Sequence, residues 1–361
     1  MDKITIVGGG IAGLSTAILL ARQGVKVTVY ESEYPGYGAS GNSAGILVTI
    51  MPENLLDYPL ESLEIYRSLP ESMNNIWRVR ALWINKNPGC MEKLAEIHNR
   101  RGLDTEMIDA DEAARAAGFS IRTYDREGYA LVREFVVDIG WAINAMVQEA
   151  SRLGVDIING RVVREGDAFR GPGGRLDQPM IIAGGAWSLQ LLPELKEYLV
   201  TYRCQMATIE GAKPARIIED DALHYYIVPV SPSRSNIGNG ANTLINDPHE
   251  GFNPDQEDIY DIIERYAERN PDAWNAGIVS YWAAPCNTSG DSLPIADRLD
   301  RLGEVYVLTG FNGAGLTMAP STSKRLVQHL LYNDKIPEIF RLNPSKKTTG
   351  LNYPPEPYEP C

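Results

Sequence analysis

The sequence predicts an α/β fold in two interleaved parts: a parallel sheet covered by helices, and a largely antiparallel sheet with helices of its own. The first observation is a βαβ pattern, in which β-branched runs at residues 3–7 and 25–30 flank an apolar helical stretch from Ile11 to Arg22. The second is that a buried strand, a glycine-rich turn and a helix over 320–331 repeat this pattern near the end of the chain. The third is a series of alternating strand-like runs over 202–282.

The order of these patterns predicts that the chain leaves the first domain and returns to it twice. Residues 51–119 look helical and are interrupted by prolines, which indicates an insertion outside the parallel sheet, whereas residues 138–153 are typical of an amphipathic helix. We therefore expect a first domain from residues 1–50, 138–200 and 290–342, a second domain from 51–137 and 201–289, and a surface tail from 343–361.

Composition excludes several classes of protein. The chain has 361 residues, 44% of them hydrophobic, and a net charge of −13, so it can bury a core and offers no basic surface for nucleic acid or anionic membranes. No apolar run reaches the roughly 18 residues of a spanning helix, and we expect a cytoplasmic protein. The four cysteines and four histidines are dispersed, so neither a disulfide framework nor a metal site is predicted.

A glycine fingerprint follows the first predicted strand and opens the first predicted helix. Gly8, Gly10 and Gly13 fit the pattern G-x-G-x-x-G, which allows a tight turn, close approach of a pyrophosphate to the backbone, and close packing of helix on strand. The helix N-terminus offers N–H groups and a positive dipole to phosphates. Glu31, 18 residues after Gly13, ends the second strand, where a carboxylate accepts hydrogen bonds from ribose hydroxyls. The sequence therefore predicts a dinucleotide site.

Further small-residue segments favour FAD over NAD as the dinucleotide. A nicotinamide enzyme usually completes its site with a second contiguous βαβ half, whereas here residues 39–45 bring small residues only a few positions after Glu31. Residues 182–187 form a second such segment after a buried strand. Residues 309–317 form a third before the last helix, whose N-terminus could stabilise negative charge at N1–C2=O of a reduced flavin. Separate segments that converge on one long ligand predict an extended FAD.

The ordered set of these motifs, together with Arg203-Cys204-Gln205, resembles the D-amino-acid oxidase superfamily of FAD-dependent oxidoreductases, nearest in pattern to glycine oxidase and sarcosine oxidase, over residues 3–342. The resemblance implies a Rossmann-like FAD-binding domain of the glutathione-reductase type, interleaved with the substrate domain. It implies oxidation of a small amine or amino acid by hydride transfer from the substrate α-carbon to flavin N5. The electron acceptor would be oxygen or an unidentified carrier, and the chain could form a homo-oligomer or a hetero-complex.

The motifs and the resemblance together predict the residues that bind FAD. Val163 is implied beside the adenine, and the segment from Ser40 to Leu47 along the pyrophosphate and the flavin. The full predicted set is Gly8, Gly10, Ile11, Ala12, Gly13, Glu31, Ser32, Ser40, Asn42, Ala44, Gly45, Leu47, Val163, Ala183, Gly184, Trp187, Gly310, Gly313, Ala314, Gly315, Leu316 and Thr317.

Three residues are candidates for catalysis. In the run Leu223–Pro229, strand alternation would place His224 and Tyr226 on one face, which the resemblance puts over the flavin; there Tyr226 could hydrogen-bond the substrate and His224 could take a proton. The alternative is an aromatic pair that faces the core. Cys286 lies in a segment that resembles the family's active-site segment. Covalent flavin attachment is not expected there, because the flavin-bearing cysteine of sarcosine oxidases aligns with Ala284, and an inert thiol is the alternative.

The sequence departs from the family pattern at the substrate carboxylate. Glycine-oxidase-like members carry arginines where this chain has Cys286 and Gly313, and neither residue can grip a carboxylate as a fork. Either another arginine, such as Arg80, Arg122 or Arg234, is brought in by the fold, or the substrate has no free α-carboxylate. The lysine that activates oxygen in sarcosine oxidases is replaced by Asn236, which favours a dehydrogenase slightly over an oxidase.

Three other functions stay open at this stage. The same scaffold could oxidise a 2-hydroxy acid. The chain could also be the flavin subunit of a multi-subunit dye-linked dehydrogenase, active only with partners, and a less favoured option is an enzyme with NAD as its only cofactor.

Overall fold

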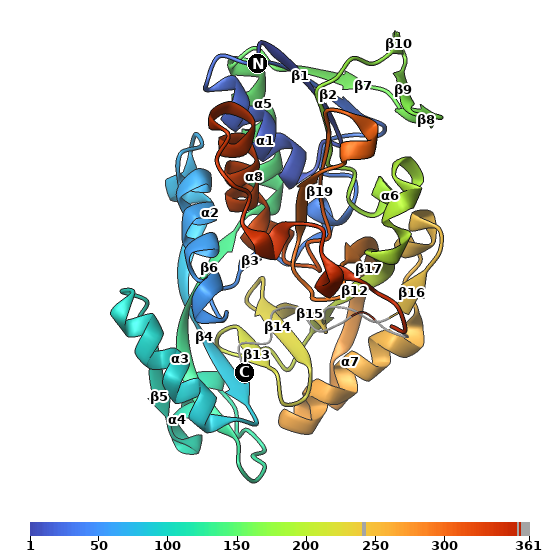
Figure 1. Cartoon of the computed structure of the whole chain (residues 1–361). Helices are drawn as coiled ribbons and strands as arrows, with labels where there is room; N and C mark the ends of the chain where they lie inside the picture. Colours follow the sequence, from blue (N-terminus) through green and yellow to red (C-terminus); the bar gives the residue numbers. More distant parts are fainter. Residues whose placement is uncertain (240–242, 352–353, 355–361) are drawn as a thin grey trace.

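The structure, a computed structural model, describes residues 1–239, 243–351 and 354, and contains two sheets that lie one above the other in Figure 1. The upper sheet has the strand order β18-β19-β11-β1-β2-β7, and its strands run parallel except for the edge strand β18. These strands are β1 (Lys3–Val7), β2 (Lys26–Glu31), β7 (Asp156–Asn159), β11 (Met180–Ile182), β18 (Ile295–Arg298) and β19 (Val305–Thr309). The predicted βαβ unit and its parallel sheet are confirmed.

Three helices pack side by side on one face of this sheet: α1 (Ile11–Ala21), α5 (Ile139–Arg152) and α8 (Gly315–Tyr332). Helix α8 begins five residues before the predicted start at Pro320. A proline inside a helix lacks the N–H that would bond the carbonyl of residue i−4, here Leu316. The Tyr66 hydroxyl donates to that carbonyl instead, at 3.0 Å, and so satisfies the acceptor that Pro320 leaves.

The lower sheet is largely antiparallel, as predicted for the second half of the chain. Its strand order is β16-β12-β15-β14-β13-β4-β6-β3, with β17 paired to β12 and β5 to β6. The strands are β3 (Ile46–Leu47), β4 (Ile76–Asn85), β5 (Glu106–Ile108), β6 (Gly128–Val137), β12 (Val200–Glu210), β13 (Ile218–Asp220), β14 (Tyr225–Pro229), β15 (Arg234–Gly238), β16 (Thr243–Ile245) and β17 (Gly277–Thr288). A separate three-stranded ribbon is formed by β8 (Val163–Glu165), β9 (Ala168–Gly171) and β10 (Gly174–Arg175).

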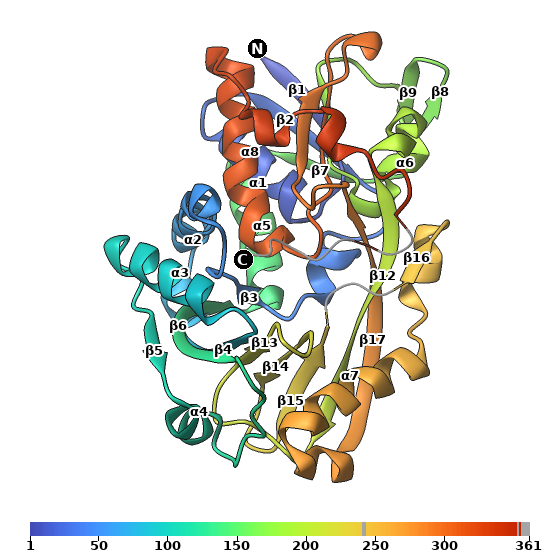
Figure 2. The same cartoon turned by 60° about the horizontal axis from the view of Figure 1, so that its bottom comes forward.

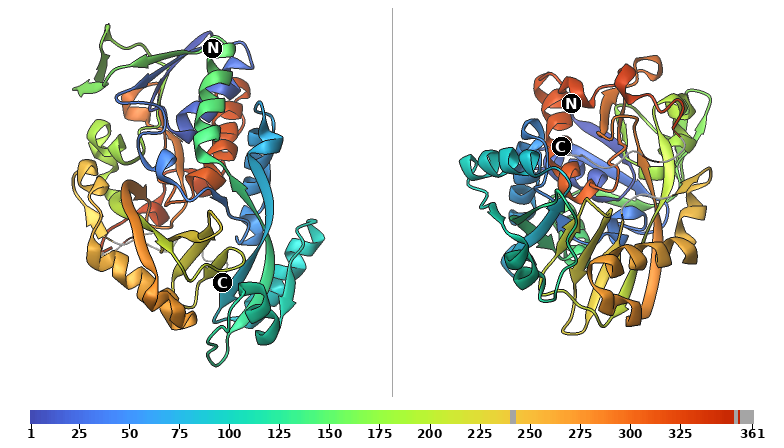
Figure 3. Two further views of the ribbon diagram at one scale, coloured as in Figure 1. Left: turned by 180° about the vertical axis from the view of Figure 1, so that it is seen from behind. Right: turned by 90° about the horizontal axis from the view of Figure 1, so that it is seen from below.

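The prediction that residues 51–119 are helical is only partly right. Helices α2 (Asp57–Arg67), α3 (Pro88–Arg100) and α4 (Ala110–Ala117) lie there, but so does β4, a ten-residue strand of the lower sheet. Its residues 81–84 are all fully buried because the core lies against both faces of the strand, so no alternation marks it. Helix α7 (Gln256–Arg269) crosses the lower sheet on the face turned away from the upper domain (Figures 2 and 3). A short helix, α6 (Ser188–Leu191), follows β11.

The first part of the predicted surface tail is anchored in the protein. Lys346 has no exposed surface, and its ammonium donates to a carboxylate oxygen of Asp291 at 2.9 Å. Gly290 lies so close to this segment that a Cβ there would stand 2.0 Å from the Lys347 carbonyl oxygen. Residues 343–351 therefore pack against the segment that follows β17, while residues 352–353 and 355–361 of the predicted tail lie outside the described residues.

In the part of the chain that the structure describes, no helix is both long and apolar enough to cross a bilayer. The same residues contain no group of three or more His, Cys, Asp or Glu side chains arranged to hold a metal ion.

Candidate active site

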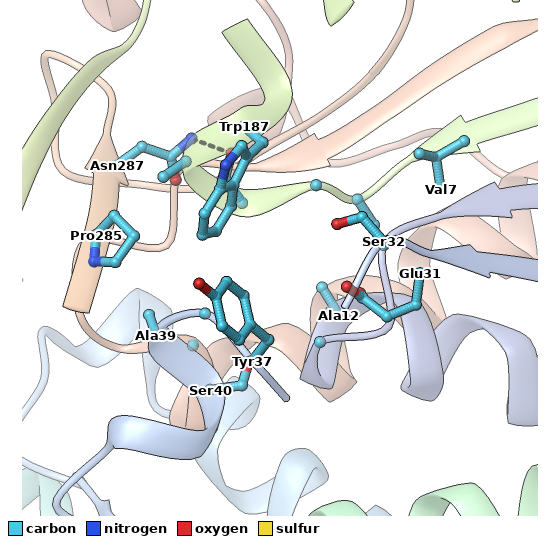
Figure 4. Close-up of a pocket in the computed structure, with 18 of the residues that line it drawn as sticks. Val7, Ala12, Glu31, Ser32, Tyr37, Ala39, Ser40, Trp187, Pro285 and Asn287 are labelled. Carbon is cyan, nitrogen blue, oxygen red and sulfur yellow. Dashed lines mark hydrogen bonds between the residues drawn. The ribbon is translucent and has the colours of Figure 1, made fainter. Parts of the chain in front are cut away.

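A first cavity of about 360 Å³ lies at the carboxyl ends of β1, β2 and β11, where open α/β sheets bind their ligands. It is long, with Glu31 and Ser32 at one end and Pro285 at the other (Figure 4). The predicted FAD-binding residues that line it are Gly8, Gly10, Ile11, Ala12, Glu31, Ser32, Ser40, Val163, Ala183, Gly184, Trp187, Gly313, Gly315 and Leu316.

Close packing explains two of the fingerprint glycines. Gly8 has φ +111°, and a Cβ there would stand 2.3 Å from the carbonyl oxygen of Ala183. A Cβ on Gly13 would stand 1.9 Å from the carbonyl oxygen of Gly8. Both distances are shorter than any real Cβ contact, so the turn between β1 and α1 requires glycine at these positions.

Two helix N-termini border the first cavity. Helix α1 begins after Gly10 and helix α8 after Ala314. Among the described residues, no side chain caps the N-terminus of either helix, and neither first turn contains an acidic residue. Such ends offer N–H groups and positive dipoles to anionic groups. The cavity therefore fits a long dinucleotide, with a pyrophosphate at α1 and a ring system that becomes negatively charged at α8.

Glu31 lies at the end of the first cavity that fits the adenosine of the dinucleotide. One oxygen of its carboxylate accepts from the Gly9 N–H at 2.7 Å and the other from the Glu33 N–H at 3.0 Å, which fixes the carboxylate beside the glycine turn. Trp187 and Tyr37 project into the middle of the cavity from opposite walls, with ring centroids 6.0 Å apart (Figure 4). Ser40 accepts from the Ile11 N–H at 3.1 Å and joins the segment 39–45 to the start of α1.

A second cavity, of about 460 Å³, opens from the first. Cys286, Asn312 and Gly313 line both cavities, so they stand where the two meet. The floor of the second cavity is the lower sheet, and the opposite wall comes from the segments that follow β2 and precede α8. Four predicted FAD-binding residues lie in that wall: Asn42, Ala44, Ala314 and Thr317.

Four predicted FAD-binding residues line neither cavity, because each is used in packing. A Cβ on Gly45 would meet the Val137 carbonyl oxygen at 2.6 Å, and Leu47 is fully buried opposite Phe135. Gly310 has φ +79° and donates its N–H to Asn287. The fourth residue is Gly13, which packs against the Gly8 carbonyl oxygen in the turn between β1 and α1.

All three candidate catalytic residues line the second cavity, but His224 does so for a different reason than the one predicted. Strand β14 begins at Tyr225, and His224 lies before it in a turn with φ +57°, so strand alternation does not govern its direction. His224 is exposed at the edge of the cavity. Tyr226 lies within β14 and crosses its neighbour β15: a Cβ on Gly238 would be 2.7 Å from the Tyr226 hydroxyl oxygen.

The Cys286 thiol stands among hydrogen-bond donors. It lies on β17 beside β12, within hydrogen-bonding distance of the Cys204 thiol, which lowers the pKa of Cys286. The Tyr202 hydroxyl and the Gly313 N–H lower this pKa further, against the effect of burial. Cys286 therefore sits in a polar pocket next to the loop that opens α8.

The fold brings no arginine to the second cavity among the described residues. Arg80 pairs with Glu106 at 2.8 Å and Arg234 with Glu210 at 3.2 Å, both on exposed surfaces, while Arg122 is exposed elsewhere. Of the two alternatives left open by the sequence, the one in which an arginine such as these three replaces the family's carboxylate fork finds no support in the lining of the second cavity. The only lysine in the cavity lining of the described chain, Lys86, is an exposed residue at its edge.

Two carboxyl groups near the second cavity, one buried and one half-buried, were missed by sequence reasoning. Glu134, on β6, has no exposed surface; its Oε1 accepts from the Thr49 N–H at 2.8 Å, and its Oε2 has no partner among the described residues. Burial raises the pKa of Glu134 to about 8. Burial, and next Glu134, raise the pKa of Glu219 on β13 well above its ordinary value. The signal available in the sequence was an acid at an alternating position of a strand, but such a position equally indicates a face of the sheet exposed to solvent.

Replacing Glu134 with glutamine is expected to stabilise the protein at about pH 9 and to change little at about pH 5. The pKa of about 8 lies above the ordinary value of 4.5, so the carboxyl's contribution to stability is fully present below pH 4.5 and is lost as the pH rises through 8. Glutamine removes the charge and keeps the shape, and the gain at high pH is expected to be on the order of a few kcal/mol. Urea unfolding across this pH range measures it.

Glu149→Gln is the matched control. Hydrogen bonds from Arg152 and Arg22 lower the pKa of Glu149 to about 2, so this carboxylate stabilises the protein at every pH above about 4.5. Its replacement is expected to lower stability at both pH values. A gain for Glu134→Gln that did not grow with pH would contradict the assignment of a buried carboxyl whose pKa is raised to about 8.

The two sheets and the two joined cavities define the chain as an oxidoreductase that binds a flavin dinucleotide. A family model described as FAD dependent oxidoreductase (DAO) matches residues 3–329, and the chain belongs to this family of FAD-dependent enzymes. The predicted cofactor is therefore confirmed as FAD, and NAD as the only cofactor is wrong.

Individual relatives share the fold at low identity. A glycine oxidase from Bacillus licheniformis is 26% identical over 355 residues, which is 91% of this chain and 92% of that protein. A 4-methylaminobutanoate oxidase (formaldehyde-forming) from Paenarthrobacter nicotinovorans is 24% identical over 91% of this chain, which spans 43% of that longer protein. The crystal structure of an L-proline dehydrogenase from P. horikoshii superposes with a TM-score of 0.79 at 20% identity, over 93% of this chain and 95% of that one.

Proposed function

We propose that this enzyme oxidises the C–N bond of a small amine that has no carboxylate on the reacting carbon. The observation that carries the proposal is the second cavity, which meets the dinucleotide cavity at Cys286 and Gly313 and is lined by a sheet tyrosine but no arginine among the described residues. The curated relatives support oxidation of a C–N bond, since their names refer to glycine and 4-methylaminobutanoate. The second of these compounds has no carboxylate on the carbons bonded to nitrogen, as we propose here, whereas glycine has one.

Bound FAD supplies a two-electron acceptor at N5, so this chain's own residues need only bind, orient and shield the amine. The wall formed by Ala44, Ile46 and Val48 is apolar and excludes water from the reacting carbon. Burial raises the pKa of Tyr226, so its hydroxyl keeps its proton and can donate to, or accept from, a bound substrate. His224 stands at the cavity edge, where it can accept a proton that the ammonium form of the substrate releases.

The proposal predicts that small amines bleach the bound flavin without oxygen present, and that α-amino acids and 2-hydroxy acids do so much less well. The measurement is anaerobic absorbance on mixing with each compound, followed by assay for the aldehyde and for released ammonia or alkylamine. Tyr226→Phe protein that keeps its FAD is expected to bleach at least about tenfold more slowly, because one positioned hydrogen bond is lost.

Tyr260→Phe is the control for that variant, because Tyr260 is an exposed residue of α7. It is expected to bleach at the wild-type rate. Bleaching by hydroxy acids alone would contradict amine oxidation, and bleaching only in the presence of cell extract would indicate a subunit that needs a partner.

A further inference from the structure

Glu219 places a carboxyl group in the floor of the second cavity. Its neighbours in β13, Ile218 and Asp220, point to the other face of the sheet, where Ile218 joins the core beneath it and Asp220 pairs with Arg269 of α7. Because side chains alternate along a strand, Glu219 points to the cavity, and it lies directly opposite Tyr226 on β14.

Nothing in the described chain satisfies this carboxyl group. Its Oε1 is shielded from solvent and has no hydrogen-bond partner. The two other acids of the lining already have partners: Asp221 accepts hydrogen bonds from Trp83 and Asn85, and Asp220 pairs with Arg269. Glu219 as a whole is half-buried, so its other oxygen can face the cavity. A shielded carboxyl oxygen without a partner is costly unless a bound ligand or a water molecule satisfies it.

The ionisable groups that raise the pKa of Glu219 are themselves acids. Glu134 on β6 and Asp221 both act to repel a second negative charge there. The two basic residues of the lining, His224 and Lys86, are exposed at the edge of the cavity. A cationic ligand group fits this part of the cavity, because it would stabilise the ionised form of Glu219 and donate a hydrogen bond to it.

We propose that Glu219 is a specificity-determining residue that binds a second, non-reacting cationic nitrogen, so that the preferred substrates are alkyl diamines or polyamines. This inference rests on the proposed amine oxidation and names its substrate class. Glu219 is in register with Met206 of β12, through Tyr226 and Gly238. Three strand spacings, roughly 14 Å, separate these two positions, which leaves room for a short alkyl chain between the acid and the β12 side of the cavity, where the two cavities meet.

The experiment uses FAD-loaded enzyme without oxygen and three compounds of equal length: 1,4-diaminobutane, butylamine and 4-aminobutanoate. The proposal predicts that the diamine bleaches the flavin at the lowest concentration and 4-aminobutanoate at the highest. Glu219→Gln is expected to raise the half-saturating concentration of the diamine about 10- to 100-fold and to leave that of butylamine nearly unchanged. Diamines with three to six carbons test the chain length.

Asp221→Asn is the matched variant, because it removes one negative charge from the same cavity at a carboxylate that already has partners. Asp221→Asn is expected to raise the half-saturating concentration of the diamine less than Glu219→Gln does. Binding is also measured without turnover, as the shift of the flavin spectrum caused by 1,4-diguanidinobutane, which wild-type enzyme is expected to bind more tightly than Glu219→Gln enzyme.

The outcomes separate this inference from the proposed function. Two results would contradict the role of Glu219 and leave amine oxidation standing. In the first, amines bleach the flavin but the diamine does so at no lower concentration than butylamine. In the second, Glu219→Gln raises the half-saturating concentrations of both amines equally. Preference for 4-aminobutanoate that Lys86→Gln abolishes would assign the specificity to Lys86 instead. If no amine bleaches the flavin, the proposed function itself fails.

Discussion

Gly8→Ala protein is expected to purify colourless and to bind added FAD at least about tenfold more weakly than the wild type, because the variant changes the backbone that faces the pyrophosphate. The new Cβ would stand 2.3 Å from the Ala183 carbonyl oxygen. Ala183 cannot simply move away, since its N–H donates to the Val7 carbonyl at 2.8 Å and continues the ladder between β11 and β1. The φ of +111° adds backbone strain for any residue with a side chain.

The measurement is the ratio of flavin to protein absorbance after purification and after incubation with FAD. Gly24→Ala is the control, because Gly24 also has a positive φ, of +81°, but a Cβ there meets no atom within 4 Å. This variant is expected to lose some stability and to keep its FAD. If Gly8→Ala protein carried FAD in full amount, the close approach at this turn would not matter for cofactor binding.

This glycine turn was predictable from the sequence, because the pattern that marks it is local. Strand, glycines, helix and Glu31 lie within about thirty consecutive residues. The atom that requires Gly13 belongs to the same turn, whereas the atom that requires Gly8 belongs to Ala183, a distant residue that the sequence does not place there. The segments 182–187 and 309–317 were predictable for the same reason. Each follows a fully buried strand and contains small residues suited to close approach of a ligand.

Strand β4 was not predictable because its burial is not local. Its exposed half carries Trp77 and Arg78, and its other half is buried on both faces, so its pattern is that of neither a half-buried strand nor a surface helix. The helix patterns on either side of it favoured the wrong assignment. The strand forms because β6, more than forty residues further along the chain, supplies its hydrogen-bond partners.

The position of Glu219 was equally hidden. In the sequence Ile217-Ile218-Glu219-Asp220-Asp221, three successive acids are typical of a solvated turn. In the structure they have three different surroundings: Glu219 faces the second cavity, Asp220 the core, and Asp221 the tryptophan and asparagine of β4. The pairing of β13 with β4, far away in the chain, separates them.

Replacing Arg269 with methionine is expected to lower the free energy of unfolding by about 3–5 kcal/mol, the loss found when one partner of a buried ion pair is removed. The Arg269 side chain has no exposed surface and lies 2.7 Å from Asp220 and 2.6 Å from Glu127, which are also buried. It also donates to the Arg122 carbonyl at 2.8 Å and stacks on Tyr124. Urea unfolding of the FAD-loaded enzyme measures the loss. Arg234→Met, which breaks an exposed pair with Glu210, is expected to cost less than about 1 kcal/mol.

The pH dependence of this loss tests whether stranded charge is its cause. Burial already raises the pKa of Asp220 while Arg269 opposes the rise, so without Arg269 the pKa of this carboxyl rises further. A raised carboxyl pKa gives stability that is lost as the pH increases, so the difference between variant and wild type should be larger at about pH 8 than at about pH 5. Adding Asp220→Asn and Glu127→Gln to Arg269→Met is expected to remove that pH dependence and to restore part of the stability, whereas a loss that is equal at all pH values would indicate lost packing. Because Asp220 fixes β13 to α7, this network also determines that Glu219, its neighbour in the strand, points to the second cavity.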